Sequence, residues 1–355
     1  MILDPAAMLD GPRGRRLCLE ILLDAARRGD SPESRDAVHQ AFWAAHALGS
    51  GSAVVFSIGD AEPFAEPDVT PEAAAEALSR VPVPEITPEV LSDALEMSVD
   101  AARYWQPPDG ADVLAAATAL RPALAAVAVA VARSAHVSRW AGTADRGDQW
   151  AVHFDGADVP AAHPRSVLPR WRAHAARSEL ERAADDPGTR WSGTWWSTPP
   201  RALPLTTGPG ESGEPRRLRH GEDGLGWTSA RAGRVSVPEG PVIEIAGPSD
   251  WAALCLRHPL VVTASRRGDW EHVAEHRGVW IQPDWASVAE ESVGVHVSVA
   301  AYLVTAGRAI PVGELGSSVL AGWSPDETYW FDPVTPQGPD ARWERDEAPG
   351  PWHPA

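Results

Sequence analysis

The 355-residue chain contains no lysine and no asparagine, so all 31 of its basic side chains are arginines. Codons for both missing residues are A-rich, and their absence is typical of a GC-rich bacterial genome. Without lysine the chain cannot form a Schiff base to a carbonyl group or to a pyridoxal cofactor, and it lacks the lysine of a P-loop. Without asparagine it has neither a Cys-His-Asn catalytic triad nor an N-glycosylation site.

Cysteine is nearly as scarce, since Cys18 and Cys255 are the only two in the chain. Two cysteines are too few for a disulfide framework or a thiolate zinc cage, so no metal is expected. One disulfide between them is an alternative, but the sequence favours two buried thiols.

Long apolar runs are also missing. The Ala/Val run over 123–132 has ten residues, about half of what a membrane span requires, and acidic residues with proline interrupt the first twenty positions. The net charge of −18 would repel a phosphate backbone. We therefore expect a cytoplasmic protein with neither a membrane nor nucleic acid as a general partner.

Three repeated helix-start signals mark the N-terminal part of the chain. Ser31, Thr70 and Thr87 are each followed by proline and glutamate, which places an N-cap hydroxyl, a proline at the first helical position and an acid in the first turn. A short apolar run over 51–60 predicts one buried strand. The pattern predicts a mostly helical domain over 1–140.

The composition changes at Trp140, because 15 of the 17 tryptophans lie at or beyond this position. Short strand and helix patterns alternate there, which predicts a Trp-rich mixed α+β domain over 141–331 and an α+β fold class for the whole chain. The polar segment at about 208–224 is expected to be a mobile loop, and 332–355 a poorly ordered Pro-rich tail. Further expected elements are a strand over 148–154, a helix over 164–184, a strand across the Trp-rich stretch and a strand over 241–246.

The Trp-rich stretch RWSGTWWSTPP, residues 190–200, is the most unusual segment of the chain. As a strand it would place Trp191 and Trp195 on one face and Trp196 on the other, with Ser197 and Thr198 directly behind. Stacking surface followed by hydroxyl groups is suited to a flat ring and its sugar. A buried strand in a Trp-rich core is the structural alternative.

An aromatic residue followed by Ser-Thr at the end of a strand resembles the nicotinamide-ribose-binding element of ADP-ribosyltransferases, whose pattern is aromatic-Ser-Thr-Ser. Trp196, Ser197 and Thr198 match it, whereas Pro199 replaces the final serine. The resemblance covers about 150–250. It implies NAD as substrate and cleavage of the nicotinamide–ribose bond.

In that family an Arg or His on an earlier strand and a Glu on a later strand complete the site. The resemblance implies His153 or Arg190 for the first role and Glu244 for the second, although position 242 is valine where the family shows Glu or Gln. A carboxylate would stabilise the oxocarbenium-like state of the ribose. The implied catalytic residues are Glu244 and His153, and the implied cofactor-binding residues are Arg190, Trp195, Trp196, Ser197 and Thr198.

Two other interpretations stay open, and the sequence leaves undecided whether the chain is an enzyme. The first is a non-catalytic module that binds a nucleotide, another small aromatic ligand or a protein. If the chain is a transferase, a protein could instead be the acceptor of the ADP-ribose group. The second is a zinc hydrolase, because HVAEH at 272–276 has the His-x-x-Glu-His order of inverted zinc peptidases. On a helix, His272 and His276 would share a face as metal ligands.

Overall fold

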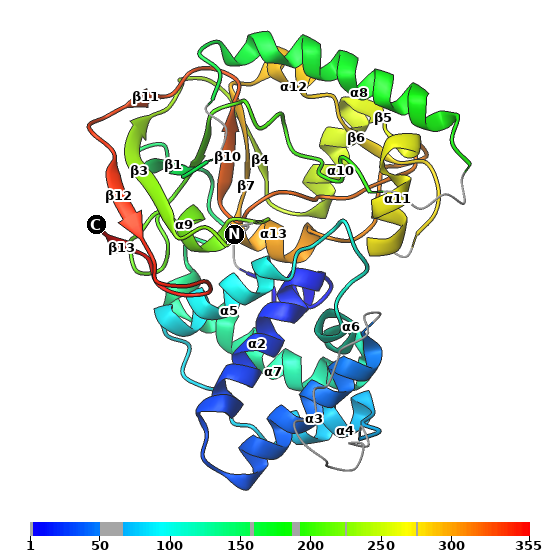
Figure 1. The fold of residues 1–355 in the computed structure, drawn as a ribbon, viewed down its shortest axis with the longest axis vertical. Coiled ribbons are helices and arrows are strands. Elements are labelled where there is room, and N and C mark those ends of the chain that lie inside the picture. The colour runs from blue at the N-terminus through cyan, green and yellow to red at the C-terminus, as the bar shows by residue number, and fades with distance from the viewer. Residues whose placement is uncertain (1–2, 50–66, 157–159, 187–191, 224–225, 275) are drawn as a thin grey trace, which may run out of the picture.

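The computed structural model describes residues 3–49, 67–156, 160–186, 192–223, 226–274 and 276–355. Helices build the N-terminal part, and a large sheet with further helices builds the rest, as Figure 1 shows. The predicted α+β class is confirmed. The strand expected at 51–60 falls outside the described residues.

The helices of the N-terminal part begin where the capping signals predict. Ser31, Thr70 and Thr87 each accept a hydrogen bond from the backbone N–H three residues later. A proline occupies the next position in all three, where its missing N–H costs nothing. The elements are α1 Pro5–Met8, α2 Pro12–Arg28, α3 Pro32–Leu48, α4 Pro71–Ser79, α5 Pro88–Asp100, α6 Gly110–Ala116, η1 Thr118–Leu120, α7 Arg121–Arg133 and η2 Ala135–Val137.

Helix α2 is the centre of this part and is buried along most of its length. It carries two buried arginines, and both are paired: Arg13 with Asp112, and Arg16 with Asp109 at 2.8 Å between Nη1 and Oδ1. Pairing is what makes burial of the two charges tolerable. The ions therefore join α2 to the start of α6.

The apolar run over 123–132 belongs to α7, whose Leu124, Val127 and Val131 are buried. Among the described residues, no single helix is long and apolar enough to cross a bilayer. The pair formed by Gly110–Ala116 and Thr118–Arg133 passes that test only when joined, and it bends by 65°.

The described residues form a nine-stranded sheet with the order β13-β12-β3-β1-β2-β10-β7-β4, and β11 pairs with β3. All neighbours are antiparallel except β4 and β7. Two two-stranded sheets lie beside it. The strands are β1 Gln149–Phe154, β2 Leu205–Thr207, β3 Ser229–Ser236, β4 Val242–Ile245, β5 Pro259–Val261, β6 Ile281–Pro283, β7 Gly294–Val297, β8 Ile310–Pro311, β9 Ser317–Ser318, β10 Glu327–Trp330, β11 Thr335–Pro336, β12 Ala341–Glu344 and β13 His353–Pro354.

The remaining helices surround this sheet. Helix α8 runs along the outer end of the molecule and packs on α11 and α12 (Figure 1). At the other end, α13 packs on α2 and α9 packs on α5. The elements are η3 Pro164–Val167, α8 Leu168–Ala183, α9 Arg217–His220, α10 Pro248–Arg257, α11 Thr263–Val273, α12 Trp285–Glu291 and α13 Val299–Thr305.

The helical part and the sheet part share a core. One buried apolar cluster extends from Leu3 through α2 and α13 to Phe331. Charged contacts add to it, because the buried Glu96 of α5 binds Arg219 of α9 and Arg345 after β12. The two parts are thus packed as one body in this structure.

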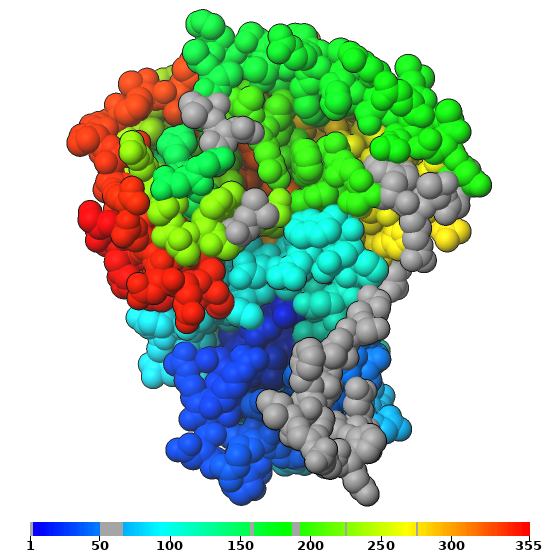
Figure 2. Space-filling model, in the orientation of Figure 1, coloured from blue at the N-terminus to red at the C-terminus, as the bar shows by residue number. Residues whose placement is uncertain are grey.

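Residues 332–355, expected to be a poorly ordered tail, instead form β11, β12 and β13. Strand β12 pairs with β3 along four residue positions. Figure 2 shows this segment lying against the helical part, where the N–H of Gly350 also reaches Glu96. The prolines were misleading because they lie at edge and turn positions, where a missing N–H breaks no ladder.

The segment at about 208–224 is not a mobile loop either. It contains a bridge between Pro209 and Pro215, followed by α9. Its charges are buried in pairs: Arg216 binds Glu211 at 2.6 Å, and both side chains are almost fully covered. Low apolar content suggested solvent exposure, but these charges are compensated within the segment and by Glu96 and Glu327 of other elements.

The described part of the Trp-rich stretch, 192–198, forms no strand. Indole groups hold its backbone instead: Trp270 Nε1 donates to the carbonyl of Trp195 at 2.6 Å, and Trp285 Nε1 to that of Ser197 at 3.2 Å. These donors satisfy carbonyls that a neighbouring strand would otherwise pair. The expected strand is therefore wrong for these residues.

Candidate functional site

A pocket of about 250 Å³, which we call the sheet pocket, opens on one face of the large sheet. Its volume lies just below the range of roughly 300–1,000 Å³ that is usual for small-molecule sites. Strands β1, β2 and β10 form its back, and the segment that contains α9 forms its side. Lining residues include Phe154, Arg201, Arg217, Glu222, Trp227 and Tyr329.

Glu222 is the most unusual group of the sheet pocket, because the residue is 6% exposed and its carboxyl is only half satisfied. Oε1 accepts a hydrogen bond from the Tyr302 hydroxyl at 3.2 Å, while Oε2 has no partner among the described residues. Burial raises the pKa of Glu222 well above its ordinary value, and the nearby Glu327 raises it further. Burial in this pocket therefore favours the neutral form of the Glu222 carboxyl.

Two arginines bring positive charge to the same pocket. Arg217 forms an ion pair with Glu327 and donates to the Ser324 hydroxyl at 3.3 Å. Arg201 lies over the ring of Trp196, 4.9 Å from its centroid, and pairs with Asp223 at 3.3 Å. About half of the Arg201 side chain is exposed, so it has donors left for an anionic ligand.

A flat aromatic wall completes the pocket. Phe154 and Trp227 stack with ring centroids 4.3 Å apart and an interplanar angle of 10°. Trp227 is only half-buried, so part of its indole faces solvent. This surface can stack against a planar ring, and the arginines beside it can bind an anionic group.

Three residues predicted from the sequence lie at or beside the sheet pocket. His153 lines it, although strand alternation directs its ring to the sheet face opposite Phe154. Trp196 supports Arg201, and its Cβ faces the lining residue Gly322. Thr198 hydrogen-bonds Tyr329, whose raised pKa comes mainly from burial.

The other predicted binding residues have structural surroundings. Ser197 is fully buried, and its hydroxyl bonds to the backbone of Ala321. Trp195 is buried with its ring 5.1 Å from that of Trp105. Neither presents a free polar group to the sheet pocket, and Arg190 lies outside the described residues.

Glu244 lies on the opposite face of the sheet. The register aligns Glu244 with His296 and His296 with Thr328, so these side chains share one face. Tyr329, the next residue on β10, projects to the other face together with Thr198. The structure therefore does not bring Glu244 to the Trp-rich segment.

Glu244 belongs instead to a charged triad with the buried His296 and with Asp326. His296 Nδ1 lies 2.6 Å from Glu244 Oε2, and Nε2 lies 3.1 Å from Asp326 Oδ1. Burial lowers the pKa of His296, but hydrogen bonds to Asp326 and Glu244 outweigh that effect and raise it to about 9. The triad joins β4, β7 and the turn before β10 as a doubly paired imidazolium.

The HVAEH segment does not form one helical face. Helix α11 ends at Val273, after His272, whose Nδ1 donates to the carbonyl of Gly268. His276 hydrogen-bonds Ser317 at 3.2 Å. Within the described residues, no three His, Cys, Asp or Glu side chains lie close enough together to hold a metal ion, and Glu275 is outside them.

Sequence reasoning missed Arg201, Arg217 and Glu222, the charged residues of the sheet pocket. Arg217 and Glu222 come from the segment that was expected to be mobile, and Arg201 directly follows the Trp-rich stretch. The available signal was the dense charge of RRLRHGED at 216–223, which is unusual for a flexible linker. No family model, curated protein or solved structure matches the chain, so its chemistry has to be argued from its own residues.

Proposed function

We propose that the sheet pocket binds a nucleotide and that, with NAD as substrate, it cleaves the nicotinamide–ribose bond. The observation that carries this proposal is the buried Glu222 carboxyl, whose second oxygen has no partner, next to an aromatic wall and two arginines. Glu222 takes the role that the resemblance assigned to Glu244, which lies on the other face of the sheet.

Each part of the pocket suits one part of such a ligand. Arg201 and Arg217 supply guanidinium donors for phosphate oxygens. A guanidinium group can form two parallel hydrogen bonds to one phosphate. The stacked rings of Phe154 and Trp227 offer a surface for a base or a nicotinamide ring. Glu222 lines the same pocket, and in this proposal it lies next to the ribose that connects the phosphates to the ring.

Glu222 acts in this proposal as the carboxylate next to the ribose. A positively charged nicotinamide ring lowers the pKa of Glu222 and offsets the cost of burial, so the carboxyl ionises when the substrate is bound. Cleavage leaves the electron pair of the C1′–N bond on the ring nitrogen, and nicotinamide departs neutral. The carboxylate stabilises the cation-like ribose and takes the proton of the water or other acceptor that bonds to C1′.

Binding is tested by titrating NAD while following the tryptophan emission, and cleavage by chromatography of released nicotinamide. Glu222→Gln should keep NAD binding and reduce nicotinamide release by at least about a hundredfold. Arg201→Gln should weaken binding about tenfold, and Arg342→Gln, on exposed β12, should change neither. Absence of a saturable response at millimolar NAD would exclude the proposal.

A non-catalytic ligand pocket is the second candidate function, and the half-satisfied Glu222 favours it as well, since a neutral carboxyl can donate a hydrogen bond to a ligand. In that case NAD or another nucleotide binds, but no nicotinamide is released. Mass spectrometry of proteins incubated with labelled NAD distinguishes hydrolysis from transfer to a protein acceptor.

A further inference from the structure

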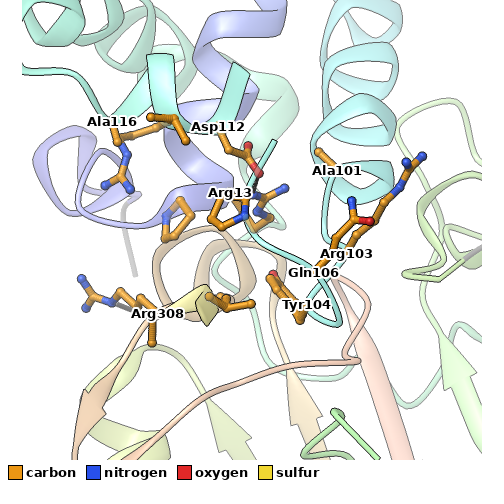
Figure 3. A pocket seen from close by; sticks show the side chains of 15 residues that line it. Arg13, Ala101, Arg103, Tyr104, Gln106, Asp112, Ala116 and Arg308 are labelled. Atoms are coloured by element: carbon orange, nitrogen blue, oxygen red, sulfur yellow. Dashed lines mark hydrogen bonds and ion pairs between the residues drawn. The ribbon is translucent and has the colours of Figure 1, made fainter. Parts of the chain in front are cut away.

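A second pocket, of about 240 Å³, lies where the helical part meets the sheet part, and we call it the junction pocket. Figure 3 shows it between the start of α2, the segment that follows α5 and the turn that carries Arg308. Both parts of the molecule contribute side chains. Its polar lining consists mainly of Arg13, Arg15, Arg103, Tyr104, Asp112 and Arg308.

The junction pocket is strongly positive, in contrast to a chain with a net charge of −18. Four arginines line it against a single carboxylate, that of Asp112. Asp112 already binds Arg13, and it also accepts from Arg16 at 3.1 Å, so its ion pairs go to these two arginines and not to Arg15, Arg103 or Arg308. Like charges gathered in a cavity indicate an anionic occupant.

Arg15 and Arg308 are the two arginines in greatest need of such a partner. Neither forms an ion pair with a carboxylate of the described residues, and both bond only to carbonyls, including that of Asp10 at 3.0 and 3.3 Å. The Nε atoms of both side chains are buried, and neither has a hydrogen-bond partner among the described residues. Burial lowers the pKa of Arg15, and the neighbouring Arg13 and Arg308 lower it further.

Tyr104 adds a neutral donor to these charges. Its side chain is 3% exposed, and its hydroxyl makes no hydrogen bond of normal geometry within the described residues, with the Tyr302 hydroxyl as its polar neighbour. In Figure 3 the hydroxyl end of Tyr104 points toward Arg13. Burying a hydroxyl without a partner is costly, and a ligand oxygen in the pocket would remove that cost.

We propose that the junction pocket is a binding site for the phosphate group of a small phosphorylated ligand. Arg15 and Arg308 hold the phosphate through paired guanidinium hydrogen bonds, and Tyr104 donates a further bond to it. The cavity has room for an organic group beyond the phosphate. A bound ligand bridges α2 and the turn at Arg308, and so fastens the helical part to the sheet part.

The junction pocket is also close to the sheet pocket. Tyr104 lies near Tyr302, and Tyr302 donates its hydroxyl hydrogen to Glu222. Two tyrosines therefore separate a phosphate in one pocket from the carboxyl in the other. The phosphate site does not depend on the NAD proposal, because the residues that carry the two proposals differ.

The test is calorimetric and thermal titration of the whole chain with sodium phosphate, at an ionic strength kept constant with sodium chloride. Wild type should show saturable binding and a rising melting temperature. Arg308→Gln and Arg15→Gln should each weaken phosphate binding at least tenfold, whereas Arg342→Gln, on exposed β12 and outside both pockets, should leave it unchanged.

Glucose 6-phosphate serves as a second probe. If it binds more tightly than inorganic phosphate, the site takes an organic phosphate; equal affinities mean that the phosphate group alone is recognised, and both results support the site. A wild-type chain that responds to neither probe beyond the chloride control overturns the proposal. An unchanged phosphate affinity of the Arg308→Gln variant also overturns the proposal. If Arg308→Gln does not fold, Arg308→Lys takes its place, because lysine keeps the charge but lacks the paired donors.

Discussion

Deprotonation of His296 should destabilise the protein as the pH rises above neutral. The buried imidazolium is held between Glu244 on β4 and Asp326 before β10, and Asp326 also lies 3.5 Å from Arg216 Nε. Loss of the proton would leave two carboxylates facing a neutral ring inside the sheet. His296→Gln produces that situation permanently.

The expected size follows from the pKa of His296. Its value is about 9 in the folded chain and 6.5 in the unfolded chain, so the difference is 9 − 6.5 = 2.5 units. At about 1.36 kcal/mol per unit, this corresponds to about 3 kcal/mol. Because the folded pKa is the higher one, the stabilisation is fully present below pH 6.5 and is lost as the pH rises through 9.

The assay is urea unfolding of wild type and His296→Gln between pH 6 and 9.5, followed by tryptophan fluorescence. Titrating groups distant from His296, such as Glu222, change the unfolding free energy of both proteins equally. Their contribution therefore cancels when the two free energies are subtracted. Wild type should be the more stable at pH 6, and its advantage should shrink by about 3 kcal/mol at pH 9.5. An advantage that stays constant across this range would refute the reasoning, since His296 would then keep one protonation state.

Three further predictions concern other buried groups. Burial raises the pKa of Glu222, so the stability of wild type should fall as the pH rises above about 4.5. In the same assay, the free energy of unfolding of Glu222→Gln should therefore rise relative to that of wild type between pH 4 and 8. Gly322→Ala should lower the free energy of unfolding by at least roughly 1–3 kcal/mol in urea titrations, because its φ is 81° and an added Cβ would lie 2.5 Å from the Cβ of Trp196. Cys18 and Cys255, both free and fully buried, should react with a thiol reagent only after unfolding; rapid labelling of the native chain would contradict their burial.

The sequence predicts the helical part well because its signals are local. An N-cap hydroxyl, a proline and an acid within three residues act on the same turn, and Ser31, Thr70 and Thr87 all start helices as expected. The strands expected at 148–154 and 241–246 also follow from short alternating or apolar runs, and the structure has them at Gln149–Phe154 and Val242–Ile245. None of these elements needs a distant partner to be recognised.

The candidate site could not be predicted in the same way, because distant residues decide it. Glu222 is buried by Tyr302 and α9, and nothing in the sequence near it indicates this. Glu244 was expected to face the Trp-rich stretch, yet the register of β4, β7 and β10 sets its face. Alternation along one strand identifies two faces but not which of them a separate segment will cover.

The position of β10 in the sheet has a consequence for how the chain can be assembled during synthesis. This strand joins β2 to β7 and so links the β1, β2 and β3 side of the sheet to the β4 and β7 side, although it is made after all of them. Until residue 330 has left the ribosome, the two sides remain separate sheets with unpaired edges. A nascent chain that stalls before this point would therefore expose strand edges to its neighbours, and we expect the sheet to close late in translation.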